Sequence, residues 1–196
     1  MRKFALLIAL TIFSPLTWAD DSPYKIGGIW GMAATNGGDE LVEFDIVYED
    51  GDVDGKDVEA GELVYFFGGI NLSKNQTPWS SQLTLGYHFG GVLTGSDSVK
   101  FTRMPIDLLF TGRFGKHAIS TGGTYHLNPK LDISDLGLKN VRFSNAAGAI
   151  IQYAYFSNDR SSIGIRYTKI EYEVNERYYT GKFDGSHIGL FLTGYF

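Results

Sequence analysis

An acidic stretch at residues 49–59 comes nearest, in residue types and spacing, to a metal site. It reads EDGDVDGKDVE, and its three alternating aspartates followed by Gly55 match the opening of a D-x-D-x-D-G calcium loop. Ca²⁺ takes about six to eight oxygen ligands. The closing Glu of such a loop is missing, because Gly61 stands at the twelfth position and Glu62 one place later. The candidate ligands are Asp50, Asp52, Asp54, Asp57 and Glu59, and the alternative is a solvated acidic loop that interacts through divalent ions.

The four histidines are not spaced as in known catalytic or metal-binding motifs. No H-E-x-x-H, G-x-S-x-G or metal-spaced histidine pair occurs in the sequence. His126 stands beside Tyr125 near the end of a strand-like run, and Ser120 lies six residues earlier. A hydrolase built on these two residues is one hypothesis, but the sequence favours a protein without catalytic residues.

Other polar side chains alternate with apolar ones. Such alternation predicts strands with one apolar and one polar face. The polar residues singled out in this way are Gln82, His88, Arg103, Asp107, Arg166 and His187.

The elements that carry these residues are long, strand-like runs bounded by Gly, Asn, Asp or Ser. Runs of this length exceed the average of about 5–6 residues for soluble strands and suit tilted strands of about 9–11 residues that cross a bilayer. We predict eight: 24–35, 61–73, 79–91, 98–111, 114–126, 142–157, 160–173 and 184–196.

The connections between these runs alternate in length. Short links are expected at KNQTP, at Gly112-Arg113 and at Asn158-Asp159, and longer ones at 36–60, 92–97, 127–141 and 174–183. Short turns on one side and long loops on the other are typical of outer-membrane barrels. The segment 40–50 also alternates, and we place it as a hairpin-like extension in the first outer loop, with a shifted strand boundary as the alternative.

The two faces of the runs predict what each contacts. Leu83, Leu85, Tyr87 and Phe89 should face lipid, as should Met104, Ile106, Leu108 and Phe110, and Ile163, Ile165 and Tyr167. The polar set should face the lumen, which in an eight-stranded barrel is just wide enough to be filled by side chains. We expect Arg–Asp pairing there, and the alternative is a path for protons or solutes. A soluble sandwich would alternate too, but strand length, loop asymmetry and Tyr and Trp near the run ends favour the membrane.

The first 19 residues have the form of a secretory signal peptide. Arg2 and Lys3 precede an apolar run from Phe4 to Phe13, and Thr17-Trp18-Ala19 resembles a cleavage site. Removal of this segment leaves 15 basic and 22 acidic residues, a net charge of −7, which argues against nucleic-acid binding. Cysteine is absent, which excludes a disulfide-stapled domain. We predict one domain, 20–196.

The whole pattern resembles the small eight-stranded outer-membrane barrels of Gram-negative bacteria, of the OmpA-barrel, OmpX and OmpW kind. The signal peptide, the eight alternating runs and the final strand HIGLFLTGYF carry the resemblance. It implies an all-β, antiparallel, up-and-down transmembrane barrel. It also implies that the last strand is read by the barrel-assembly machinery, although Gly194 stands where a large residue is usual. The residues of this signal are Ile188, Leu190, Leu192 and Phe196.

The resemblance leaves the activity open among three alternatives. The first is a structural or surface-interaction protein without an open pore, a monomer whose partners are membrane lipid and lipopolysaccharide. The second is a narrow conduit for small or apolar solutes, for which Gly86 and Gly164 would leave room. The third is a lipid A-modifying hydrolase, but the His-x-Ser-Asn stretch of that type is absent, because Arg142 precedes Ser144-Asn145 where a histidine would stand. No cofactor is expected beyond calcium at the first outer loop.

Overall fold

A computed structural model describes residues 22–47, 53–94, 97–176 and 179–196. The predicted signal peptide, Asp50 and Asp52 lie outside these residues. The described elements are β1 (Tyr24–Asn36), β2 (Glu40–Val47), β3 (Val53–Glu59), β4 (Leu63–Lys74), β5 (Trp79–Thr94), β6 (Asp97–Phe114), β7 (His117–Asp132), η1 (Ser134–Leu136), β8 (Val141–Arg142), β9 (Ala146–Asn158), β10 (Ser161–Glu176), β11 (Tyr179–Asp184) and β12 (His187–Tyr195). In this part of the chain no helix is long and apolar enough to cross a membrane.

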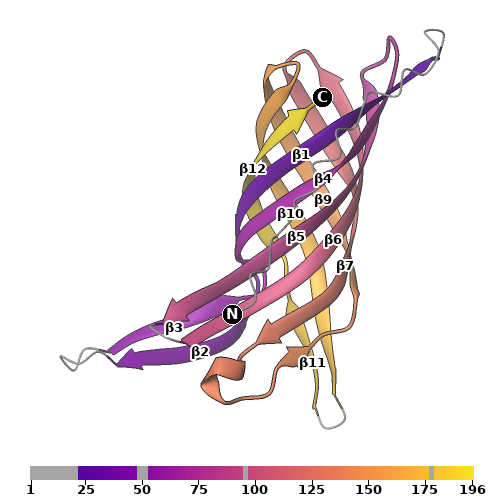
Figure 1. Ribbon diagram of the computed structural model, residues 1–196. Coiled ribbons are helices and arrows are strands. Elements are labelled where there is room, and N and C mark those ends of the chain that lie inside the picture. Colours follow the sequence, from indigo (N-terminus) through magenta and orange to yellow (C-terminus); the bar gives the residue numbers. More distant parts are fainter. Residues whose placement is uncertain (1–21, 48–52, 95–96, 177–178) are drawn as a thin grey trace, which may run out of the picture.

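Eight of the strands form a closed antiparallel ring, β1-β4-β5-β6-β7-β9-β10-β12, in which β12 returns to pair with β1. These eight correspond to the eight predicted runs, and the predicted fold class is confirmed. Closure leaves no unpaired edge along the ring, which is what a sheet in lipid requires. The strands are steeply tilted, and β2, β3 and β11 project beyond one end (Figure 1).

The two ends of the barrel differ in their connections. At one end, here the short-turn end, β4–β5, β6–β7 and β9–β10 are joined by residues 75–78, 115–116 and 159–160. The opposite, long-loop end carries the other connections. There β2 and β3 form a separate two-stranded sheet, so residues 40–47 belong to a loop hairpin and add no ninth strand to the ring.

Several predicted connections are corrected. The β9–β10 turn is Asp159-Arg160 rather than Asn158-Asp159, because β9 includes Asn158, and β7 continues to Asp132 within the predicted loop 127–141. The β6–β7 turn is Gly115-Lys116 rather than Gly112-Arg113, because Gly115 takes a φ of +64°, as the first residue of a type II′ hairpin turn does. Gly112 stays in β6, where the Trp79 ring fills the space of its missing side chain. The predicted loop at 92–97 is also wrong, since β5 continues to Thr94 and β6 begins at Asp97.

The exterior carries a continuous apolar surface. Leu83, Leu85 and Leu108 are about half exposed, in contrast to their buried neighbours in the same strands. Aromatic side chains occupy strand ends next to the short turns, with Trp79 opening β5 and Phe114 closing β6 in an edge-to-face pair. The three predicted apolar faces all lie outward, and all of their residues except the half-buried Ile106 are exposed. An apolar exterior over a polar interior is the pattern of a barrel that crosses a membrane.

The C-terminus closes the ring. Phe196 donates its N–H to the Gly28 carbonyl at 3.0 Å and accepts the Gly28 N–H at 2.7 Å, while its ring lies over Gly28 with 74% of its surface exposed. Trp30 lies directly opposite Gly194, and its indole occupies the space that a side chain there would need. An aromatic ring therefore covers this position, but it comes from β1 rather than from the last strand.

Candidate functional site

The inward face of β6 places charged and polar residues along most of the barrel. Arg103, Asp107 and Thr111 are buried, and Arg113 is half-buried near the short-turn end. They alternate with outward Met104, Leu108 and Phe110, as the period of a strand requires. These inward residues of β6 mark successive layers of the lumen along the barrel.

The central layer is built around the buried carboxylate of Asp107. Arg166 of β10 donates from Nη1 to Asp107 Oδ2 at 2.9 Å, and the Tyr65 hydroxyl donates to the same oxygen at 2.9 Å. Arg166 Nε donates to Gln152 Oε1 at 2.8 Å. The guanidinium also lies 5.4–5.7 Å from the ring centroids of Tyr65, Phe67 and Phe191. Asp107 and Arg166 thus form a compensated ion pair enclosed by aromatic rings.

A second layer, here called the histidine layer, lies toward the long-loop end and comprises His88, His126 and His187 around Arg103, which is 1% exposed. Its Nη2 lies 3.1 Å from His88 Nε2, and because a guanidinium can only donate, His88 accepts and is a neutral imidazole. His187 Nδ1 donates to the Gly185 carbonyl at 2.8 Å, and His126 Nδ1 lies 2.6 Å from the Tyr172 hydroxyl. Arg103 stacks on Phe101, with its Cζ 4.8 Å from the ring centroid. Among the described residues, Arg103 Nε and Nη1 have no hydrogen-bond partner.

Two apolar clusters flank these layers. The outer plug, at the long-loop end, comprises Val58, Ala60, Val99, Phe101, Leu131, Ile133, Phe143, Ala146, Ile170, Tyr172 and Val174. The inner cluster, toward the short-turn end, comprises Ile29, Ala33, Tyr65, Phe67, Ala118, Ala154, Phe156 and Phe191. The cavity between the central and the histidine layers is about 10 Å³, near the lower limit for one water molecule.

The six predicted lumen residues all lie inside the barrel. His88, Arg103 and His187 lie in the histidine layer, Asp107 and Arg166 in the central layer, and Gln82 near the short-turn end. The expected Arg–Asp pairing is found between Asp107 and Arg166, whereas Arg103 contacts histidine and aromatic rings.

Sequence reasoning missed several partners of these residues, namely Tyr65, Gln152 and Tyr172. All three stand at inward positions of alternating strands, and that parity is the signal that could have found them. The room expected at Gly86 and Gly164 is also absent. The Tyr65 ring fills the space beside Gly86, and the Phe191 ring fills that beside Gly164.

The hydrolase pair is not brought together. His126 and Ser120 are both buried on β7, separated along the strand by about 20 Å at the usual rise per residue. His126 contacts Tyr172, and Ser120 lies 2.8 Å from the Thr111 hydroxyl. Ser144 is exposed. The expectation that His126 marks an outer strand end with a serine at hand is therefore wrong.

The calcium candidates are described only in part. Asp54 and Asp57 occupy β3, paired with Ile46 and Glu43, while Asp50 and Asp52 are outside the described residues. The Glu59 carboxylate accepts the Gly37 N–H at 2.9 Å. Calcium binding stays a prediction.

No family model matches the sequence, and no curated protein matches it. Three solved structures are similar to this chain over most of its length. The crystal structure of Neisserial surface protein A (NspA) shares 9% identity, covering 89% of this chain and 98% of that chain, with a TM-score of 0.39. The solid-state NMR structure of outer membrane protein AlkL in DMPC bilayers shares 11% identity, covering 93% and 95%, with a TM-score of 0.45. The crystal structure of outer membrane protein OprG from Pseudomonas aeruginosa shares 14% identity, covering 87% and 95%, with a TM-score of 0.40.

Proposed function

We propose that this chain is an integral outer-membrane barrel of the structural or surface-interaction type, whose lumen carries no open pore. One observation carries the proposal. Among the described residues, side chains of the central layer, the histidine layer and the outer plug occupy the lumen, and the cavity between the first two is about 10 Å³. A hydrated ion needs a continuous path much wider than this.

The long-loop end is the part that acts on partners in this proposal. At this end the β2–β3 hairpin and β11 project beyond the barrel (Figure 1). Loops held by a rigid scaffold are where binding residues concentrate. The partners proposed are lipopolysaccharide, with calcium or another divalent ion bridging to the acidic loop, and other surfaces met outside the cell. The barrel-assembly machinery is the proposed partner during insertion.

Conductance measurement tests the closed lumen. The refolded protein is added to planar lipid bilayers, and insertion is verified by the shift in gel mobility between heated and unheated samples. We expect no conductance steps, with a known open porin as the positive control. Reproducible steps, or uptake of small solutes by liposomes carrying the protein, would favour the conduit. A lost or gained acyl chain in lipid A from overexpressing cells would favour the hydrolase.

A loop replacement tests the surface role. Glu43 pairs with Asp57, so residues 43–57 can be replaced by Asn-Gly, a two-residue turn that suits a hairpin. Val42 and Val58 are kept, because Val58 is buried in the outer plug. We expect the variant to fold and to bind lipopolysaccharide in the presence of Ca²⁺ less well than the parent. Unchanged binding and unchanged adhesion would remove the basis for the surface role.

A further inference from the structure

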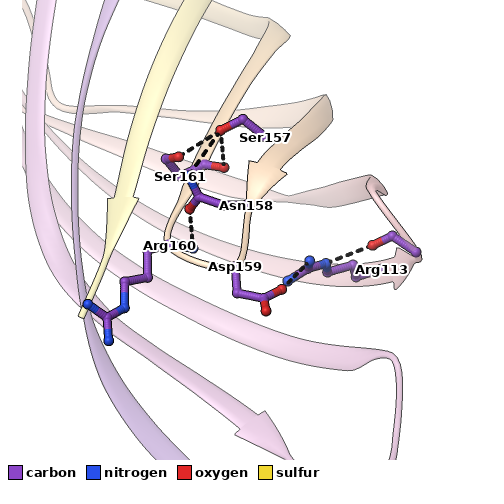
Figure 2. A network of polar contacts seen from close by, with 7 residues as sticks. Arg113, Ser157, Asn158, Asp159, Arg160 and Ser161 are labelled. Atoms are coloured by element: carbon purple, nitrogen blue, oxygen red, sulfur yellow. Dashed lines mark hydrogen bonds and ion pairs between the residues drawn. The ribbon is translucent and has the colours of Figure 1, made fainter.

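The short-turn end of the barrel is basic. Its described side chains include five cations, Lys25, Lys74, Arg113, Lys116 and Arg160, and one carboxylate, that of Asp159. Arg113 donates from Nη2 to Asp159 at 2.8 Å. Figure 2 shows this pair on one side of the β9–β10 turn, with the Arg160 side chain extending away from Asp159 on the other. The pair leaves a net positive rim.

A cavity of about 430 Å³ lies inside this rim. We call it the vestibule and define it by Asn71, Ser73, Gln82, Thr111, Arg113 and Tyr195. The inner cluster, with Phe156 bordering the vestibule, closes it toward the centre of the barrel. Its volume falls in the range of about 300–1,000 Å³ typical of small-molecule sites.

Three contacts hold the side chain of Arg113 in the vestibule wall. Arg113 Nε donates to the Gly115 carbonyl at 2.9 Å, Nη2 contacts Asp159, and Cζ lies 4.0 Å from the centroid of the Phe156 ring. Asp159 offsets part of the charge, but its side chain is 92% exposed, so water screens the pair. Asp159 also lines the vestibule, so the lining carries both signs of charge, and the positive field that attracts anions comes from the excess of cations on the surrounding rim.

Apart from Arg113 and Asp159, the residues that line the vestibule are uncharged, and several carry hydrogen-bonding groups. Gln82 and Asn71 present amides, and Ser73 and Thr111 present hydroxyls. Asn71 Oδ1 is buried and has no hydrogen-bond partner among the described residues. A buried carbonyl oxygen of this kind needs a donor. A ligand with hydroxyl groups would supply one.

We propose that the vestibule binds a small hydroxylated organic anion of the glycerophosphate class. The anionic group lies near Arg113 and the basic rim, and hydroxyl groups reach the amides of Asn71 and Gln82. The chemistry is shared by free glycerophosphates and by the headgroup of phosphatidylglycerol. This site lies at the opposite end from the one proposed to act at the cell surface, and neither proposal depends on the other.

Trp79, which borders the vestibule, provides the readout. After signal removal the chain keeps Trp30 and Trp79, and a Trp30→Phe background isolates the second. In maltoside micelles at constant ionic strength, sn-glycerol 3-phosphate should change Trp79 emission saturably. Inorganic phosphate should bind more weakly, and glycerol should give no saturable change. A linear response to all three would overturn the proposal.

Variants separate specific binding from general charge. Arg113→Gln should weaken glycerol 3-phosphate binding by about tenfold or more, as loss of a charge-assisted hydrogen bond does. Lys139→Gln removes the same charge at an exposed site of the long-loop end and should leave binding unchanged. Asn71→Leu should reduce the preference for glycerol 3-phosphate over phosphate. Equal affinity in the parent and Arg113→Gln would contradict the site. If Arg113→Gln does not fold, Lys25→Gln with Lys116→Gln carries the same expectation.

Nanodiscs distinguish the two sources of ligand. In phosphatidylcholine alone, glycerol 3-phosphate should bind as in micelles. If added phosphatidylglycerol weakens that binding, the lipid headgroup competes for the vestibule and is a source of the ligand. If it does not, the vestibule takes the free molecule.

Discussion

The two ends of this barrel differ in the side chains that the same strands place inside them. At the long-loop end, inward positions carry Phe101, Leu131 and Tyr172, which pack together in the outer plug. At the short-turn end, inward positions carry amides, hydroxyls and Arg113 around an open vestibule. The charges differ as well, since the long-loop end bears a predominance of acidic residues, among them Asp39, Glu40, Glu59, Asp132, Glu171, Glu173 and Asp184. The long-loop end is apolar inside and acidic outside, and the short-turn end is lined by polar groups and is basic, so a partner meets different chemistry at each.

The largest expected effect comes from breaking the layer between the two ends. Arg166→Met leaves the Asp107 carboxylate buried without its cation, and we expect a loss of about 3–5 kcal/mol in the free energy of unfolding. Denaturant titration in lipid vesicles measures it. The double variant Asp107→Leu with Arg166→Met removes both charges and should lose less. If the double variant were less stable than Arg166→Met, the ion pair would not be the cause.

A smaller effect is expected in the half of the barrel that holds the outer plug. Tyr172→Phe removes the hydroxyl 2.6 Å from His126 Nδ1 and leaves a buried ring nitrogen unpaired. The expected cost is about 1–3 kcal/mol. The lipid-facing Tyr87→Phe is the matched control, and it should cost less because Tyr87 is 49% exposed. Equal losses in the two variants would argue against the contact between Tyr172 and His126.

The open end should tolerate the loss of its ion pair. Asp159→Asn breaks the contact with Arg113, and because the Asp159 side chain is largely exposed to water, the free energy of unfolding should change by less than about 1 kcal/mol. The same denaturant titration, repeated at low and high salt, checks this. A loss as large as that of Arg166→Met would mean that the two ends are not energetically distinct.

Local alternation was enough to predict the strands, because each strand must place one face in lipid and one in the lumen. It also predicted that Gln82, Arg103 and Asp107 lie inside the barrel. The positions of the turns were harder to predict from the sequence than the strands. Gly112 and Gly115 both suit a turn in sequence, and only Gly115 adopts the positive φ.

The contacts across the lumen could not be predicted from sequence. Asp107 meets Arg166 and Tyr65, which lie 59 and 42 residues away. Which inward positions share a layer depends on the stagger of the strands around the ring, which no single run encodes. The prediction of empty space beside the inward glycines was wrong for the same reason. Gly86 suggested empty space, but the strand beside it places the Tyr65 ring there.

The smallest expected effect concerns the acidic end, where charges are exposed and paired with neighbours along the chain. Lys130 Nζ contacts Asp132 Oδ2 at 2.7 Å, and this bond, with those from Ser134, lowers the pKa of Asp132 to about 2. A carboxyl whose pKa is depressed by folding stabilises the protein above its unfolded pKa of about 4, and the contribution is lost as the pH falls toward 2. NMR titration of the Asp132 carboxyl should show the depressed pKa, and Lys130→Gln should raise it. The control Lys139→Gln, in the same loop, should leave it in place. An unchanged pKa of Asp132 in Lys130→Gln would contradict this. It would show that the acidic end lacks the local ion pairing by which it differs from the basic rim.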